Sequence, residues 1–322
     1  MSSKVKNRIM AAGLAMSAWL AGPLAGAQSV DTAILTVARR YFLTQADARC
    51  HLLDPATAMA LKGGYVQARN AAIRSGRDMT QLTPYLDAAR AAADRSPCDA
   101  PQLNAEAATA RASFSSFAAM PRLSLPAGRA SWSADRSHEQ ADAWRLVQYQ
   151  SSAGANAAMG LYGSLGDNRL VVMARFADGA KPYAARLLVR DPDMTPLGIV
   201  NPSAYSMTTS APLGFGSGAL NFPARGMSDV QAALRPAVAA NGFGFSLTGD
   251  YVGTQPVAED AVRFDFSTRA YPAIARLDPR EDMVVEFDFS DGPRFMRFGV
   301  GDFITGLSFI ALPSPYGGGL AG

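Results

Sequence analysis

The spacing of apolar residues changes along this chain, and that change constrains the fold more than any other feature. From Asp31 to about Met120, apolar residues recur every three or four positions, which predicts helices. From Trp144 onward, short runs of Val, Phe, Leu and Tyr are separated by Gly, Pro, Asp and Asn, which predicts strands. The sequence therefore predicts a two-domain α+β protein, with an N-terminal helical bundle and a C-terminal antiparallel β-sandwich or barrel-like domain.

The same pattern sets the expected boundaries. We assign residues 28–120 to the helical domain, 121–143 to a polar linker containing Pro and Gly, 144–316 to the β-rich domain and 317–322 to a Gly-rich tail. Trp132 in the linker is expected to dock onto a neighbouring domain. One helix, capped by Ser228 and carrying Val230, Leu234 and Val238, is expected to interrupt the strands. The strands are expected near 144–150, 159–165, 169–176, 183–191, 243–252, 261–267, 283–290, 294–300 and 307–312.

Residues 1–27 have the order of a secretory signal peptide. Lys4, Lys6 and Arg8 precede an uncharged apolar stretch, which ends in small residues up to Ala27, just before Gln28. A retained membrane anchor is the alternative, because the stretch is nearly as long as a bilayer is thick. The Gly and Pro residues within it favour cleavage after Ala27 instead. We therefore expect a periplasmic or secreted protein of the bacterial envelope, with no stable membrane span after processing.

Removal of this leader changes the charge of the protein. The leader carries two Lys, one Arg and no acid, so the formal net charge falls from +3 to 0 when it is cleaved. A neutral chain lacks the basic excess that drives binding to nucleic acid. We expect an envelope protein or polysaccharide as partner, and no nucleic acid.

The chain contains two cysteines, Cys50 and Cys98. In an exported protein, two thiols at a long separation predict one structural disulfide rather than a redox-active pair. The bridge would join the end of the first predicted helix to the start of the last one. Because the helices are rich in Ala and bury little apolar area, such a crosslink is physically useful.

The strongest candidates for chemistry lie on one predicted strand. Glu286 and Asp288 alternate with apolar residues, so both carboxylates would project from the same face. The segment Glu286–Asp291 resembles the E-x-D-x-x-E strand of jelly-roll glycoside hydrolases. By that resemblance Glu286 would be the nucleophile and Asp291 the acid/base, although Asp is one bond shorter than the family's Glu. Asp288 and Asp265 are further candidates for the second acid.

A structural role for these acids is the favoured interpretation. On an exposed strand face they would pair with Arg263 or Arg294 across the sheet. The repeat of Phe-Asp-Phe-Ser at 264–267 and 287–290 is typical of neighbouring strands and requires no catalysis.

Other chemistries lack their motifs. The chain has two histidines, His51 and His138, in the predicted helical domain and linker, where neither suits a serine-nucleophile site. The zinc motifs H-E-x-x-H and H-x-x-E-H are absent from the sequence, and the Gly clusters at 160–166 and 214–218 lack the G-K-[ST] of a phosphate-binding loop. We therefore expect no metal and no cofactor.

Several strings, at 132–136, 144–148, 277–281 and 300–303, are similar to those of a family of exported bacterial proteins of unknown function. That resemblance implies export and no particular activity. The sequence thus favours a non-enzymatic binding or assembly role in the envelope. The alternative is a carbohydrate-active hydrolase that uses paired carboxylates.

Overall fold

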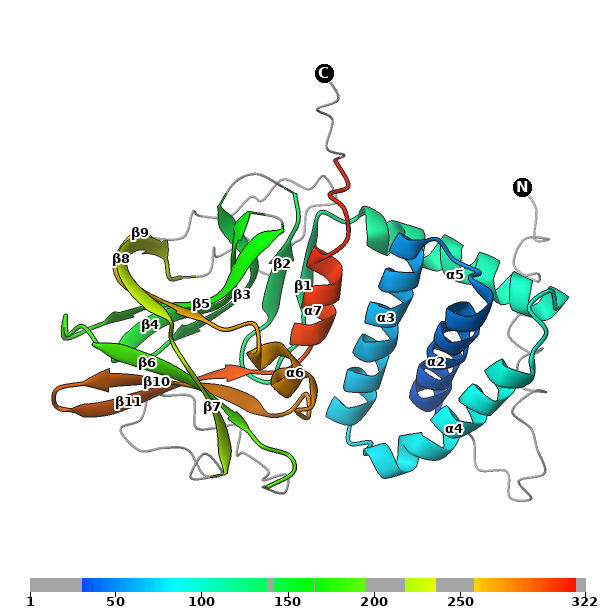
Figure 1. Ribbon diagram of the computed structural model, residues 1–322, viewed down its shortest axis with the longest axis horizontal. Coiled ribbons are helices and arrows are strands. Elements are labelled where there is room, and N and C mark those ends of the chain that lie inside the picture. The colour runs from blue at the N-terminus through cyan, green and yellow to red at the C-terminus, as the bar shows by residue number, and fades with distance from the viewer. Residues whose placement is uncertain (1–30, 138–141, 165, 195–217, 236–257, 317–322) are drawn as a thin grey trace, which may run out of the picture. The chain divides into compact units, whose positions relative to one another are not determined.

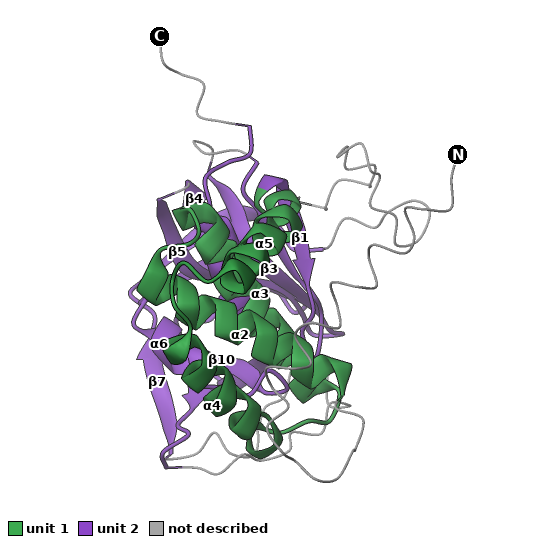
Figure 2. Cartoon of the chain, turned by 90° about the vertical axis from the view of Figure 1, so that its right-hand side faces the viewer, with its two compact units in different colours: residues 1–118 green, residues 119–322 purple. Residues whose placement is uncertain are grey.

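The computed structural model describes residues 31–137, 142–164, 166–194, 218–235 and 258–316. The chain gathers into two compact units, residues 1–118 and 119–322, which Figure 2 shows in different colours. The first unit is helical, and the second contains two antiparallel sheets and two short helices. The expected α+β class is therefore confirmed.

The helical unit has four helices in the described residues (Figure 1). Aspartate side chains begin the first three of them, because Asp31, Asp54 and Asp78 each accept a hydrogen bond from a backbone amide of the first turn. Asp54 with Pro55 is the start that the sequence predicted. The helices are α2 (Thr32–Cys50), α3 (Pro55–Arg74), α4 (Met79–Arg95) and α5 (Pro101–Ala119).

The core of this unit is built largely from small residues. Helix α2 packs against both α3 and α4. Ala46, Ala93 and Ala107 are buried beside Leu61 and Leu103. Alanine allows close helix packing but removes little apolar surface from water, so the core alone provides modest stabilisation.

A disulfide strengthens this core, as the sequence predicted. Cys50 at the end of α2 is bonded to Cys98, which lies just before α5, and the bridge closes a loop with a sequence separation of 48. Closing a loop of that length restricts the unfolded chain and stabilises the fold by about 4 kcal/mol in the chain-entropy model.

We predict that the double variant Cys50→Ala, Cys98→Ala loses a large part of the contribution of the disulfide to the free energy of unfolding, because its unfolded chain regains the entropy of an open loop. Urea unfolding of the variant and the oxidised wild type, followed by circular dichroism at helical wavelengths, measures the difference. Reduction of the wild type with dithiothreitol should reproduce the loss. Equal midpoints for oxidised and reduced protein would contradict the prediction.

The β unit contains a seven-stranded sheet, which we call sheet A, and a four-stranded sheet B. Sheet A has the order β1 (Arg122–Leu125), β2 (Trp132–Asp135), β3 (Ala143–Ser151), β4 (Ala155–Ser164), β5 (Asp167–Phe176), β9 (Ala258–Phe266) and β8 (Gly226–Ala233). Sheet B has the order β11 (Gly292–Gly299), β10 (Asp282–Phe289), β6 (Ala184–Arg190) and β7 (Ala219–Pro223). Two short helices follow β9 and β11, namely α6 (Ala270–Ala275) and α7 (Phe303–Ile310).

An aromatic layer joins the two sheets. The ring of Phe176 on β5 lies 5.2 Å from that of Phe287 and 4.7 Å from that of Phe289, both on β10. Phe264 on β9 lies 6.0 Å from Phe287. Because these rings come from facing sheets, the unit is a sandwich, and its sheets do not close into a barrel within the described residues.

The chain passes directly from one sheet to the other between β7 and β8. The amide of Ala224 donates to the carbonyl of Ala185 on β6, and the next amide, that of Arg225, donates to the carbonyl of Asp265 on β9. Strands β7 and β8 therefore form one bent segment, which pairs with sheet B over its first half and with sheet A over its second.

The segment predicted as a linker differs from the structure. Residues 121–143 contribute β1 and β2 to sheet A, and Trp132 on β2 is fully buried. Its indole nitrogen donates to the carbonyls of Gly299 and Val300, and its ring lies 5.0 Å from that of Phe303. Trp132 thus docks inside the β unit itself. The sequence did not reveal strand β2, because a strand of four residues is too short to show a period.

Two further elements were predicted with the wrong type. Residues from Ser228 form strand β8 instead of a helix, because pairing with β9 outweighs an apolar spacing that fits either period. Residues 303–310 form helix α7, although 307–312 was predicted as a strand, since a short continuous apolar run does not reveal its period. The strand predicted at 243–252 and the end of the predicted helix lie outside the described residues.

Candidate functional site

Glu286 and Asp288 lie together on β10, as the sequence predicted. Val285 and Phe287 point into the sandwich and are fully buried, so the two acids project from the outer face of sheet B. Arg186 on β6 lies opposite Glu286 in the register and contacts both acids. Its guanidinium is 2.6 Å from Oδ2 of Asp288 and 3.5 Å from Oε2 of Glu286.

The other two candidate acids lie elsewhere. Asp291, in the turn after β10, is exposed and bonds to Arg294 at 3.0 Å. Asp265 is on β9 of sheet A and bonds to Arg263 at 2.6 Å. Because its neighbour Phe264 points into the aromatic layer, Asp265 faces away from sheet B.

The four acids therefore do not form one cleft, and each is held by an arginine. Asp265 and Asp291 do contact Arg263 and Arg294, but Asp265 and Arg263 share one strand and Asp291 and Arg294 are three residues apart at one turn, so the predicted pairing across the sheet is not found for them. For Glu286 and Asp288 the partner is Arg186, because the sequence does not reveal that β6 is the neighbour of β10.

Burial affects the charge of Glu286. Partial desolvation raises the pKa of its carboxyl above the ordinary value, while the charge of Arg186 lowers it and the charge of Asp288 raises it further. A raised pKa in the folded state means that the folded protein holds this proton more tightly than the unfolded chain does. This group therefore contributes less stability as the pH rises from its unfolded pKa, about 4.3, through its folded pKa.

We predict that Glu286→Gln becomes more stable relative to the wild type as the pH rises through that window. The glutamine keeps the shape but does not ionise, so the cost of a buried carboxylate disappears above the unfolded pKa. Urea titrations at a series of pH values measure this directly. The prediction fails if the difference between variant and wild type is the same at every pH. Asp291→Asn, at an exposed position, serves as the control.

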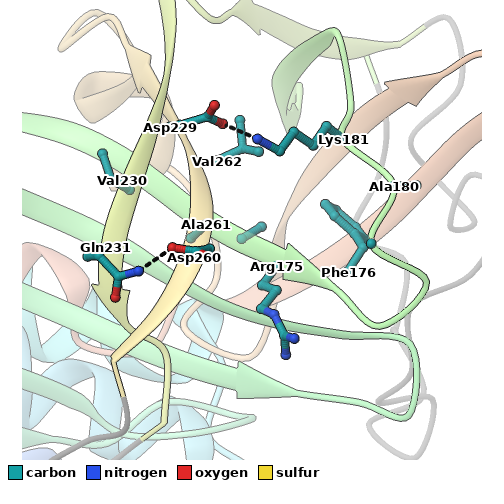
Figure 3. Close-up of a pocket in the computed structure, with 12 residues that line it drawn as sticks. Arg175, Phe176, Ala180, Lys181, Asp229, Val230, Gln231, Asp260, Ala261 and Val262 are labelled. Atoms are coloured by element: carbon teal, nitrogen blue, oxygen red, sulfur yellow. Dashed lines mark hydrogen bonds and ion pairs between the residues drawn. The ribbon is translucent and has the colours of Figure 1, made fainter.

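The β unit contains a cavity of about 520 Å³ along β8 (Figure 3). Its apolar part includes Phe176, Ala174 and Val262, all of which are buried. These side chains belong to the inner face of sheet A, the face that carries the aromatic layer. The cavity is thus an opening into the interior of the sandwich.

Strand β8 forms one side of this opening. Asp229 pairs with Val262 in the register, so Asp229 and Gln231 belong to the same inner face. Both are nevertheless exposed to solvent. Sheet B therefore does not cover the inner face of sheet A along β8.

The connection between β5 and β6 forms the opposite wall, and Arg294 holds it in place. The guanidinium of Arg294 donates to Asp178 at 2.7 Å and to Asp291 at 3.0 Å. It also lies 4.1 Å from the ring centroid of Phe289 and 5.9 Å from that of Phe176. One arginine thus links the cavity wall, the β10–β11 turn and the aromatic layer.

We predict that Arg294→Ala raises the pKa of Asp178 towards its ordinary value. The hydrogen bond from Arg294 is the main reason why this pKa is lowered, with a further contribution from the amide of Ala180. Titration of the Asp178 carboxyl carbon by NMR in both proteins measures the shift. Amide exchange in residues 177–183 should also become faster in the variant. Unchanged titration of Asp178 would contradict the assignment, and Arg269→Ala, on an exposed arginine of the same unit, is the control.

Charged groups line the rim of the cavity. Lys181 lies 2.8 Å from Asp229 and so links the two walls, as the dashed line in Figure 3 shows. Gln231 donates to Asp260. An apolar floor with a few polar groups at the rim is the usual composition of a binding site.

A second cavity, of about 370 Å³, lies further along the same strand. Its lining includes Tyr183 and Met227, which are 67% and 57% exposed, together with Arg186 and Asp288. Both cavities are thus bounded by β8 on one side and by residues of the 179–186 segment on the other. Of the acid pair from the sequence analysis, Asp288 lines this second cavity, and neither acid lines the first.

The larger cavity was not predicted from the sequence. A helix over β8 would not place Met227, Asp229 and Gln231 on the same face, whereas a strand does. The sequence Met-Ser-Asp-Val-Gln at 227–231 does not alternate apolar with polar residues, so it carried no period-two signal for this strand.

Searches against protein-family models, curated proteins and solved structures gave no match for this chain. Among the described residues, no cluster of three or more His, Cys, Asp or Glu side chains is arranged to hold a metal ion. None of the helices in the described ranges combines the length and the apolar character needed to cross a membrane.

Proposed function

We propose that this protein is exported to the bacterial envelope and has a non-enzymatic binding or assembly role there. Its β unit would bind an envelope protein or polysaccharide at the opening beside β8. The observation that carries the proposal is the 520 Å³ cavity, because it combines a buried apolar floor with a charged rim.

Two independent features support export. The first 27 residues have the order of a signal peptide that ends at Ala27. The Cys50–Cys98 disulfide is of a kind that persists in oxidising compartments such as the periplasm.

The contacts of the acids favour binding over hydrolysis. A glycoside hydrolase needs one carboxyl group free to donate a proton and a second one about 5 to 9 Å away, with room for the sugar. Here Arg186 occupies the space between Glu286 and Asp288. One observation favours the hydrolase alternative, namely the raised pKa of Glu286. A side chain in that state could act as a general acid if a substrate displaced Arg186.

The binding role predicts contact with the partner at the rim of the cavity. A photo-crosslinking amino acid in place of Gln231 should form an adduct in living cells, because this exposed side chain borders the cavity. The same amino acid in place of Asp167, exposed at the start of β5, is the control and should form none. Equal labelling at both positions would contradict a specific site.

Intact mass of the recovered protein tests export in the same experiment, since a chain that begins at Gln28 and contains the disulfide is expected. A chain that retains residues 1–27 with two free thiols would overturn the proposal. Release of reducing sugar from envelope polysaccharide by the wild type but not by Glu286→Gln would establish the hydrolase instead.

A further inference from the structure

Strand β8 ends the order of sheet A, and in the described part of the chain no strand pairs with its other edge. Residues 226–229 and 231 are exposed, with Val230 half-buried. An edge of this kind offers backbone amides and carbonyls for pairing with another chain.

The remaining terminal strands carry features that discourage such pairing. Strand β1 has only four residues and is bordered by Pro121 and Pro126. Strand β7 has five residues and ends in Pro223. Strand β11 contains Pro293, Arg294 and Arg297. Short length, proline and basic side chains are the usual means by which proteins protect a sheet edge.

Strand β8 lacks each of these features. It has eight residues, Gly-Met-Ser-Asp-Val-Gln-Ala-Ala, without proline, lysine or arginine. Its one charged side chain, Asp229, is paired with Lys181. That ion pair is 64% and 71% exposed, so it contributes little free energy and opens readily.

The edge also faces a groove of suitable shape. The 520 Å³ cavity lies beside Asp229 and Gln231, and the 370 Å³ cavity lies beside Met227. A strand placed along β8 would send alternate side chains into these cavities.

From these observations we infer that β8 binds an extended peptide segment of a partner protein, which adds a strand to sheet A. The inference rests on the proposed binding function and specifies its partner. Main-chain hydrogen bonds would provide affinity, and the cavities would select the side chains. Because the floor is formed by Phe176, Ala174 and Val262, apolar side chains at alternate positions are favoured.

A second copy of this chain fits the edge less well. Lys181 of the β5–β6 connection contacts Asp229, so this connection lies directly beside β8. Two copies joined edge to edge would bring both connections into the same space. The groove therefore suits one strand better than a second sheet.

Selection of peptides from a displayed random dodecapeptide library tests the inference on the mature, oxidised protein. Enriched peptides should carry apolar residues at alternate positions. Binding of a synthetic copy should slow amide exchange in residues 226–231, because free edge amides become hydrogen-bonded. Enrichment without such protection would overturn the inference, and so would the absence of any specific peptide.

Proline substitution provides the matched variants. Successive amides in a strand point to opposite edges, so one of the two variants Ser228→Pro and Asp229→Pro removes an amide from the free edge and the other removes one that faces β9. The variant that loses the free-edge amide keeps its pairing with β9, so it should keep a cooperative thermal transition. It should weaken peptide binding at least about tenfold, as expected for the loss of a backbone hydrogen bond and the clash at its site. The control Ser228→Ala, at a residue that lines neither cavity, keeps the amide and should bind within about twofold. Unchanged binding by a folded proline variant would overturn the inference.

The outcomes separate this inference from the proposed function. Cross-linking at Gln231 to a polysaccharide, with no peptide selected, would leave a binding site at the opening but exclude strand addition. An absence of cross-linking at Gln231, together with peptides that protect β8, would support strand addition and reject the envelope role as stated.

Discussion

The contact between the two sheets depends on an aromatic layer, and the candidate site is a consequence of where that layer ends. Phe287 and Phe289 of sheet B pack against Phe176 and Phe264 of sheet A. Large rings contribute most of the apolar area at such an interface. Phe176 belongs both to the layer and to the floor of the cavity, so the rigidity of the core extends into the opening.

Arginine–carboxylate pairs also position the strands of the β unit. Arg129 binds Asp282 and Arg190 binds Glu281, both through two hydrogen bonds and with little exposure. Buried pairs of this kind fix geometry more than they add stability, because desolvation offsets most of the attraction. The same residue types that suggested acid/base chemistry in the sequence therefore position strands in the structure.

The parts of the fold that could be predicted were those with a long, unambiguous period. Helices α2 to α5 follow from the spacing of their apolar residues, the Cys50–Cys98 bridge follows from the presence of two cysteines, and most long strands follow from their composition. Strands β1 and β2 are too short to show a period. Strand β8 and helix α7 have apolar patterns that fit more than one structure, and their neighbours decide the outcome. The site was hidden for the same reason, since it depends on which strands become neighbours.

The hydrogen bond from Trp132 to Gly299 has a consequence for how the protein matures. Its two partners are 167 residues apart, so the indole of Trp132 gains this hydrogen bond only when the last strand, β11, is available. A topology dominated by such distant contacts folds slowly, because the chain loses the entropy of closing long loops before the distant contacts add stability. The core of the β unit can therefore be completed only after the chain has been synthesised as far as β11, close to the end of the described residues.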